Sequence, residues 1–172
     1  MKLGLMADSH ENMPAIAKAV ALFNQEGVAR VLHAGDIISP ITAKEFARLK
    51  MPLTAVFGNN DGEKFFLREK FREIGEIHER KWEGELGGKR VLLLHAPDML
   101  DALSASGAYD LIVYGHTHEV VVRQGKTLVV NPGECGGWLT GRCTVAILDT
   151  ERMTAEIRDL KRGQATFQTV SH

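Results

Sequence analysis

The stretch Leu111-Ile112-Val113-Tyr114-Gly115-His116-Thr117-His118 joins an apolar run to a pair of histidines. The apolar half is typical of a buried strand, and the glycine marks its end. His116 and His118 leave the loop on roughly the same side, because side chains two residues apart point the same way. A polar loop is one interpretation of such a pair. The other is a metal site, because imidazole is the commonest metal ligand among side chains.

Four more predicted strand ends upstream carry polar residues of the same kind. They are Asp8 with His10, then Asp36, then Asn59, and finally His95. In α/β sheets, ligands gather at the carboxyl ends of the strands. We therefore expect all these side chains to meet at one edge of the fold, and this shared position matters more than any single motif.

Length and composition limit the class of protein. A chain of 172 residues is the size of one ordinary domain, so we expect a single domain over 1–172. The formal net charge of -1 gives no basic face, which argues against nucleic-acid binding as the main task. The sequence shows no run long enough to span a bilayer and no signal segment, so a cytoplasmic location is expected. Cys135 and Cys143 are expected to be free thiols, with a disulfide that closes a short loop as the alternative.

The order of the predicted elements indicates an α/β domain. The first half alternates strands with helices, which implies parallel strands joined by right-handed crossovers. Asn12 is expected to cap the first helix and Gly27 to end it. Further strands are expected at 2–7, 30–34 and 52–57, and further helices at 42–50, 63–74 and 99–106. Three hairpins are expected from 76–85 with 89–94, 120–123 with 127–130, and 142–149 with 153–160. Together they predict two mixed sheets between helical layers.

Seven candidate ligands are too many for one tetrahedral ion and suit two ions that share a carboxylate. They are Asp8, His10, Asp36, Asn59, His95, His116 and His118. The set mixes nitrogen and oxygen and has no thiolate. It therefore favours Mn, Fe, Co, Ni or Zn over an all-oxygen site for Mg or Ca.

The motifs resemble those of the calcineurin-like metallophosphoesterase superfamily, and in particular its minimal single-domain bacterial and archaeal phosphodiesterases. The resemblance covers nearly the whole chain, from Lys2 to about Leu160. It is carried, in order, by Asp8-x-His10-x-Asn12, Gly35-Asp36, Gly58-Asn59-x-Asp61, His95 and Gly115-His116-x-His118. It implies a four-layer α/β/β/α sandwich of two mixed β-sheets flanked by helices.

The resemblance also implies a site and a reaction. One divalent ion would be held by Asp8, His10, His118 and a bridging Asp36, and the other by Asp36, Asn59, His95 and His116. Manganese is the ion expected first, with Ni, Co, Fe and Zn as alternatives. Hydroxide between the two ions would attack the phosphorus in line. Asp36, Asn59, His95 and His116 would act in catalysis by holding that hydroxide, while Asp61 would orient a ligand or a water from behind the ligands.

Two positions depart from patterns found elsewhere in the superfamily. Its phosphoprotein phosphatases have a histidine after the metal-binding Asn, where this chain has Asn60, and a carboxamide cannot act as a general acid. Many relatives have serine after the Pro132-Gly133 pair, where this chain has Glu134. Near the metals, Glu134 would repel a phosphate dianion more than a diester monoanion, although a solvated loop residue is the preferred interpretation. Trp138 is interpreted as a packing residue, with stacking on a base or aryl group as the alternative.

The leading hypothesis is a dinuclear metal-dependent phosphodiesterase acting on a small phosphodiester or nucleotide. A phosphomonoesterase or nucleotide phosphohydrolase of the same chemistry is the first alternative. A metal-binding scaffold is the second, because the superfamily includes a retromer subunit with a degraded metal site. Relatives often self-associate, so a homo-oligomer is left open. The remaining conspicuous side chains are interpreted as core or contact residues: His33 in the core, and Phe65, Phe66, Phe71 and Trp82 in packing or a subunit contact.

Overall fold

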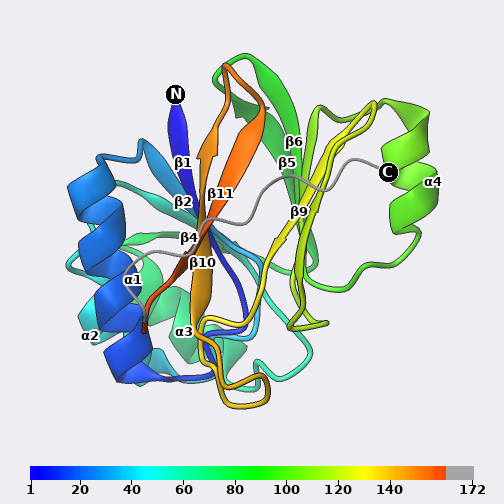
Figure 1. The fold of residues 1–172 in the computed structure, drawn as a ribbon. Coiled ribbons are helices and arrows are strands. Elements are labelled where there is room, and N and C mark those ends of the chain that lie inside the picture. The colour runs from blue at the N-terminus through cyan, green and yellow to red at the C-terminus, as the bar shows by residue number, and fades with distance from the viewer. Residues whose placement is uncertain (162–172) are drawn as a thin grey trace.

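Two mixed β-sheets face each other in the computed structural model, which describes residues 1–161. Helices cover the outer face of each sheet, so the chain forms four layers (Figure 1). The predicted α/β/β/α sandwich is therefore confirmed. No helix within 1–161 combines the length and the apolar character that crossing a membrane requires.

The first sheet has six strands in the order β11-β10-β1-β2-β3-β4. The four strands from β1 to β4 run parallel, and β10 and β11 extend the sheet in antiparallel pairing. The bounds are Lys2–Met6 (β1), Arg30–His33 (β2), Leu53–Val56 (β3), Gly75–His78 (β4), Thr144–Asp149 (β10) and Thr154–Asp159 (β11). The parallel half matches the alternation of strands and helices in the sequence.

The second sheet has five strands in the order β5-β6-β7-β9-β8. β6, β7 and β9 are parallel, while β5 and β8 pair antiparallel at the two edges. The bounds are Lys81–Leu86 (β5), Lys89–Leu94 (β6), Leu111–Val113 (β7), Val120–Arg123 (β8) and Leu128–Pro132 (β9). β7 is the strand that carries the two histidines at its end.

The helices begin and end where the sequence supplies caps. The Asn12 side chain accepts the Ala15 N–H at 3.2 Å, and Gly27 ends α1 in the left-handed conformation at φ 62°. α1, α2 and α3 lie against the first sheet, and α4 lies against the second (Figure 1). The bounds are Met13–Glu26 (α1), Ala43–Phe46 (α2), Lys64–Phe71 (α3) and Leu100–Ser106 (α4), with a 3-10 turn at Pro40–Thr42.

Three apolar clusters fill the spaces between the four layers. The first packs α1 to α3 on the six-stranded sheet and includes Phe23 and Phe46. The second lies between the sheets and includes Leu5 and Leu93. The third, smaller cluster lies under α4 and includes Leu92. Because Leu92 and Leu93 are consecutive on β6, their assignment to different clusters follows the period-two alternation of a strand buried on both faces.

Several predicted elements differ from the observed ones. The expected strand 76–85 is two strands in different sheets, because β4 pairs with β3 and the chain then crosses at Glu79-Arg80 to β5. The expected helix 42–50 is a 3-10 turn followed by one helical turn. Pairing partners of this kind are set by long-range packing, which a local pattern does not encode.

The aromatic residues of α3 divide between core and surface. Phe71 is buried as expected, whereas Phe65 and Phe66 are 74% and 53% exposed. Core packing is therefore the wrong interpretation for these two. Trp82 is half-buried and packs against the cluster between the sheets.

Candidate metal centre

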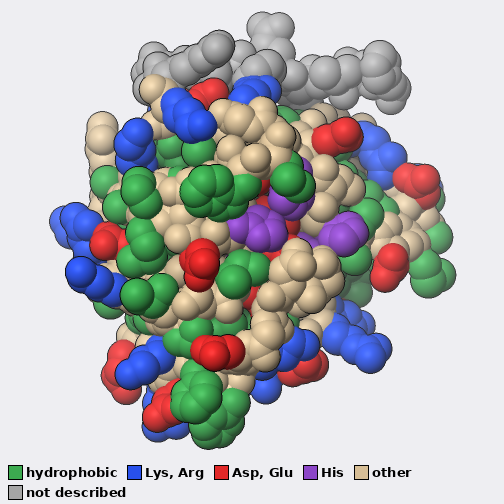
Figure 2. Space-filling view, turned by 90° about the horizontal axis from the view of Figure 1, so that it is seen from below, with side chains coloured by type: hydrophobic (Ala, Val, Ile, Leu, Met, Phe, Trp, Pro, Cys, Tyr) green, Lys and Arg blue, Asp and Glu red, His purple; other side chains and the backbone are tan. Residues whose placement is uncertain are grey.

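The loops that follow β1, β2, β3, β6 and β7 bring all seven predicted ligands to the same edge of the fold. Figure 2 shows histidine side chains gathered in a hollow on this face, with acidic side chains among them. The residues are Asp8, His10, Asp36, Asn59, His95, His116 and His118. The meeting point expected from the strand ends is therefore where these side chains lie.

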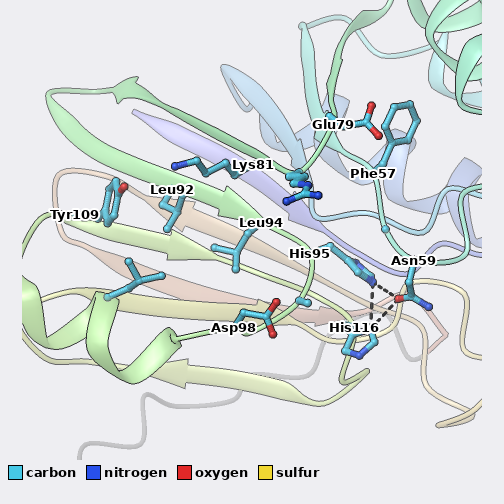
Figure 3. Close-up of a pocket in the computed structure, with 14 residues that line it drawn as sticks. Phe57, Asn59, Glu79, Lys81, Leu92, Leu94, His95, Asp98, Tyr109 and His116 are labelled. Atoms are coloured by element: carbon cyan, nitrogen blue, oxygen red, sulfur yellow. Dashed lines mark hydrogen bonds between the residues drawn. The ribbon is translucent and has the colours of Figure 1, made fainter.

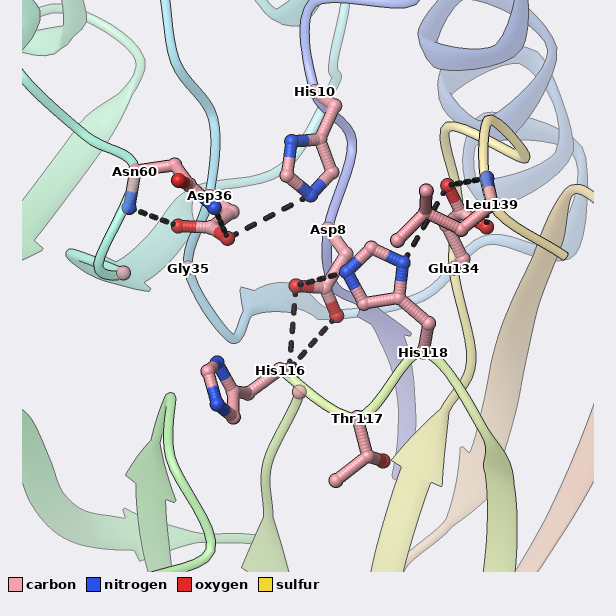
Figure 4. A network of polar contacts seen from close by, with 12 residues as sticks. Asp8, His10, Gly35, Asp36, Asn60, His116, Thr117, His118, Glu134 and Leu139 are labelled. Atoms are coloured by element: carbon pink, nitrogen blue, oxygen red, sulfur yellow. Dashed lines mark hydrogen bonds and ion pairs between the residues drawn. The ribbon is translucent and has the colours of Figure 1, made fainter.

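A first group is formed by Asp8, His10 and His118, whose ligand atoms lie within 4.8 Å of one another. His118 Nε2 lies 3.6 Å from Asp8 Oδ1, and the rings of His10 and His118 are 5.2 Å apart (Figure 4). The His116 backbone N–H donates to both oxygens of Asp8, at 3.0 and 3.2 Å. The loop after β7 therefore holds the Asp8 carboxylate through the His116 backbone N–H and also places His118 beside it.

A second group is formed by His95, Asn59 and His116. His95 Nδ1 lies 2.7 Å from the buried carbonyl oxygen of Ala34, which only accepts, so Nδ1 carries the proton. The Nε2 lone pair then points at Asn59 Oδ1, 2.8 Å away, with His116 Nδ1 at 3.2 Å (Figure 3). A nitrogen and an oxygen acceptor converging at one point suit a cation between them.

Asp36 lies between the two groups. Its Oδ2 is 3.6 Å from His10 Nε2 and 3.6 Å from His95 Nε2. The residue is 1% exposed, and Asp8, Asp36 and His95 also offer ligand atoms within 4.8 Å of one another. Asp36 is thus the carboxylate that faces both sets of histidines.

The electrostatics of the site fit bound cations. Burial and the neighbouring Asp36 charge raise the pKa of Asp8 to about 8, because two buried carboxylates repel each other without a cation. Burial also lowers the pKa of His10 and of His95, which favours the neutral imidazoles that bind metals. His10 Nε2 is buried and makes no hydrogen bond with any residue of 1–161. The buried carboxylate of Asp8 and the neutral imidazoles of His10 and His95 are therefore suited to bind divalent ions.

The backbone of the site is strained. A positive φ is uncommon outside glycine and costs about 1–3 kcal/mol, and such residues concentrate at functional sites. Among the candidate ligands, positive φ values occur at Asp8 (49°), His10 (41°), Asp36 (60°), His116 (69°) and His118 (59°). The strain shows that packing holds these loops in conformations they would not otherwise favour.

Asp61 holds two of the ligand loops together. Its buried carboxylate accepts the backbone N–H groups of Asp36 at 3.1 Å, Ile38 at 2.6 Å and Gly58 at 2.7 Å. Burial raises the pKa of Asp61. A Cβ on Gly58 would overlap the Asp36 carboxylate, which explains the glycine before Asn59.

Asn60 contributes through a contact that the sequence did not predict. Its backbone N–H donates to Asp36 Oδ1 at 2.9 Å, and its side-chain amide donates to Asp36 Oδ2 at 2.8 Å (Figure 4). The only available sequence signal was its place directly after Asn59. A contact with a residue 24 positions away depends on the fold.

Glu134 is buried, so its interpretation as a solvated loop residue is wrong. It is 1% exposed, and its carboxylate accepts the N–H groups of Trp138 at 2.6 Å, Leu139 at 3.0 Å and Thr140 at 2.9 Å. Burial alone would raise its pKa, but these hydrogen bonds bring the pKa below its ordinary value. Oε1 lies 3.5 Å from His118 Nδ1, on the side of the ring away from Asp8. Glu134 therefore fixes a loop and faces a candidate ligand.

Two other side chains have definite positions around the site. Trp138 is 65% exposed and donates its indole N–H to the His10 carbonyl oxygen at 3.0 Å, so its interpretation as a packing residue is wrong. Asn12 caps α1 as expected, and its amide donates to the Gly136 carbonyl oxygen at 2.6 Å. Both contacts tie the loop after β9 to the loop after β1.

His33 is a core histidine, as the sequence predicts. It is fully buried, accepts the Gly35 N–H on Nδ1 at 3.1 Å, and lies with Nε2 2.9 Å from Ser9 Oγ. Burial lowers its pKa to about 3. Cys135 and Cys143 are both buried free thiols, as expected, and burial raises the pKa of each.

Comparison with known proteins identifies the family. The sequence model of the calcineurin-like phosphoesterase superfamily domain matches residues 1–153. Phosphodiesterase MJ0936 of Methanocaldococcus jannaschii is 42% identical over 157 residues, covering 88% of this chain and 95% of that protein. Phosphodiesterase YfcE of Escherichia coli is 29% identical over 152 residues, covering 77% of this chain and 78% of that protein.

A solved structure gives the same assignment. A novel archaeal phosphodiesterase superimposes with a TM-score of 0.87 at 39% identity, covering 92% of this chain and 99% of that chain. The resemblance noted in the motifs is thus confirmed over most of the length. The chain belongs to the calcineurin-like phosphoesterase superfamily and is a phosphoric ester hydrolase.

Proposed function

We propose that the chain is a phosphodiesterase that works with two divalent ions. The observation that carries the proposal is the position of Asp36, whose Oδ2 lies 3.6 Å from both His10 Nε2 and His95 Nε2. A carboxylate that lies between two sets of histidines is placed to bridge two ions. The relatives named phosphodiesterases, from Methanocaldococcus jannaschii and Escherichia coli, support the reaction class.

The ligands divide into two sets around Asp36. Asp8, His10 and His118 would hold one ion, and Asn59, His95 and His116 the other. Manganese is the ion we expect first, because the mixed nitrogen and oxygen donors suit a transition metal; Ni, Co, Fe and Zn are alternatives. The chemistry that such a pair supplies when bound is an activated water and neutralisation of the phosphoryl oxygens.

The residues around the ligands keep them oriented. The His116 N–H holds the Asp8 carboxylate, and the Ala34 carbonyl oxygen fixes the tautomer of His95. Asp61 orients the Asp36 loop through three backbone N–H groups. Such outer contacts preserve ligand geometry and basicity.

The site favours diesters with good leaving groups. Asn60 is a carboxamide hydrogen-bonded to Asp36, so it supplies no proton to a departing alkoxide. Glu134 adds a buried carboxylate beside His118, and this charge repels a monoester dianion more than a diester monoanion. Both features favour diesters over monoesters.

The test is turnover of bis(p-nitrophenyl) phosphate beside p-nitrophenyl phosphate. The protein is stripped with chelator and then supplied with Mn, Ni, Co, Zn or Mg in separate reactions. Diester turnover that returns with a transition metal and exceeds monoester turnover is the expected result. A monoester preference would instead indicate a phosphomonoesterase. A folded protein without turnover in any metal would indicate a scaffold.

A further inference from the structure

A pocket of about 500 Å³ opens beside the second ligand group. His95, Asn59 and His116 form its inner end, and the pocket continues from there over the outer face of β6 (Figure 3). Its volume lies in the range of about 300–1,000 Å³ that is usual for small-molecule sites. The proposed hydrolysis needs only the inner end, so the rest of the pocket is available to another part of the substrate.

The interior of the pocket is apolar. Leu92 and Leu94 point outward from β6, since the alternate residue Leu93 faces the other sheet. Leu103 of α4 and the ring of Tyr109 contribute further apolar surface. In Figure 3, Leu92 and Leu94 lie between Tyr109 and His95, so an apolar path connects the aromatic ring with the ligand histidines.

Glu79, Arg80, Lys81 and Asp98 are the charged residues at the rim, and two of them, Glu79 and Lys81, are held in ion pairs. Lys81 pairs with Glu83, and the Glu83 carboxylate interacts with the Tyr109 hydroxyl. Glu79 pairs with Lys64 and Arg68, each at 2.9 Å.

The wall between the inner end and Tyr109 is formed by Leu92, Leu94 and Leu103, which offer no hydrogen-bonding side chains. An apolar planar group therefore suits it better than a bare sugar, whose hydroxyls would need several hydrogen-bond partners.

We infer that this pocket receives one ester substituent of the substrate, and that this substituent carries a planar aromatic ring, as a nucleoside or an aryl alcohol does. The inference rests on the proposed function for the phosphoryl group, which the ligand residues at the inner end would hold. The ring then lies against Leu92, Leu94 and Leu103, and Tyr109 stacks on it. Stacking of a base on an aromatic side chain strengthens binding by about 5- to 150-fold.

Calorimetric titration of the manganese-loaded full chain tests the inference without requiring turnover. The three ligands are thymidine 5′-monophosphate, phenyl phosphate and methyl phosphate, which share the phosphate and differ in the substituent. We expect the two ring-bearing ligands to bind at least about tenfold more tightly than methyl phosphate. Thymidine binding more tightly than phenyl identifies the ring as a nucleoside base, and equal binding identifies an aryl ring.

Two variants alter the pocket in opposite ways. Tyr109→Ala removes the stacking ring, and Leu103→Trp fills the space while keeping the surface apolar. Both should reduce the preference for the ring to below about threefold and leave methyl phosphate binding unchanged. Phe65→Ala is the matched control, because it removes an exposed aromatic ring from α3 outside the pocket.

Three results would overturn the inference. They are equal binding of all three ligands, a preference that survives in both pocket variants, and a preference that disappears in Trp138→Ala instead. The last would place the ring at the exposed indole beside His10. If the ring preference is present while diesters are not hydrolysed with any metal, the proposed function fails and the pocket assignment stands.

Discussion

Asn60 orients the Asp36 carboxylate through two hydrogen bonds, one from its backbone N–H to Oδ1 at 2.9 Å and one from its side-chain amide to Oδ2 at 2.8 Å. The carboxylate proposed to serve both ions is thus oriented by the residue that follows a candidate ligand, Asn59. Where phosphoprotein phosphatases of the superfamily are expected to have a proton donor, this chain has a positioning residue.

Asn60→Ala should weaken metal binding without unfolding the protein. The side-chain donor to Asp36 is lost, and removal of such an outer partner lowers metal affinity about 10–100-fold. Because Asn60 is exposed, the melting temperature of the metal-free protein should hardly change. Manganese calorimetry and thermal unfolding measure the two effects. Asn24→Ala, which removes an amide that bonds Arg48 and Lys50 far from the site, is the control for loss of an amide. Unchanged manganese affinity in Asn60→Ala would contradict the proposal that Asn60 orients Asp36 for metal binding.

Glu134→Ala should lower both stability and metal affinity. Three backbone N–H groups of the loop 138–140 lose their acceptor, which costs about 2 kcal/mol in the free energy of unfolding. His118 also loses the carboxylate that lies 3.5 Å from its Nδ1, so manganese should bind about tenfold more weakly. Urea unfolding and calorimetry report these changes. Glu119→Ala, an exposed acid next to His118, controls for charge, and a similar loss in that variant would show that no specific contact is involved.

Asp61→Asn should destabilise the protein although Asp61 is no proposed ligand. Oδ2 of Asp61 accepts the backbone N–H groups of Asp36 and Gly58, and Oδ1 accepts that of Ile38. The substitution turns one of these oxygens into an NH₂ group, which cannot accept. Each buried N–H donor that is left unpaired costs about 1–3 kcal/mol in the free energy of unfolding. We expect a loss of about 2 kcal/mol by urea unfolding. Asp101→Asn, at an exposed ion pair with Arg123, should change stability by less than about 0.5 kcal/mol. Equal losses in the two variants would contradict this account.

The pair of Arg90 and Asp110 should contribute stability that depends on pH. Hydrogen bonds from the Arg90 side chain and backbone lower the pKa of Asp110 to about 2. A depressed folded-state pKa stabilises the fold above the unfolded pKa, near 3.8, and the contribution is lost as pH falls toward 2. Solvent screens this partly exposed pair, so Asp110→Asn should lose about 1 kcal/mol at pH 7. The difference from the wild type should shrink between pH 4 and pH 2 in urea unfolding, and a constant difference would exclude the ionised pair as its source.

The sequence predicts the architecture well because the signals are local. Asn12, Pro14 and Gly27 delimit α1, and apolar runs mark β1, β2, β3 and β7. The positions of the ligands follow from these strands, since parallel strands end at the same edge. What the sequence does not encode locally is the choice of partner. The segment after α3 reads as one strand, and only packing divides it between two sheets at Glu79-Arg80.

The surroundings of the ligands were harder to predict for the same reason. Glu134 reads as a polar loop residue, yet the loop 138–140 folds back and buries its carboxylate. Asn60 and Asp61 both act on Asp36 from more than twenty residues away. Left-handed backbone at His10, His116 and His118 is also not readable from a sequence, because only a few per cent of non-glycine residues adopt a positive φ even though histidine is enriched among them.

The central claim is that two ions share Asp36, and manganese titration with the metal-stripped chain tests it most directly. The wild type should bind two ions per chain and hydrolyse bis(p-nitrophenyl) phosphate. Asp36→Ala should lose at least one of the two binding events. Its turnover should fall by more than about 100-fold, which exceeds the effect of removing a residue that only hydrogen-bonds a ligand. Asp101→Ala, which removes an exposed carboxylate, should behave as the wild type. A wild type that saturates with one ion, or full turnover in Asp36→Ala, would contradict the account.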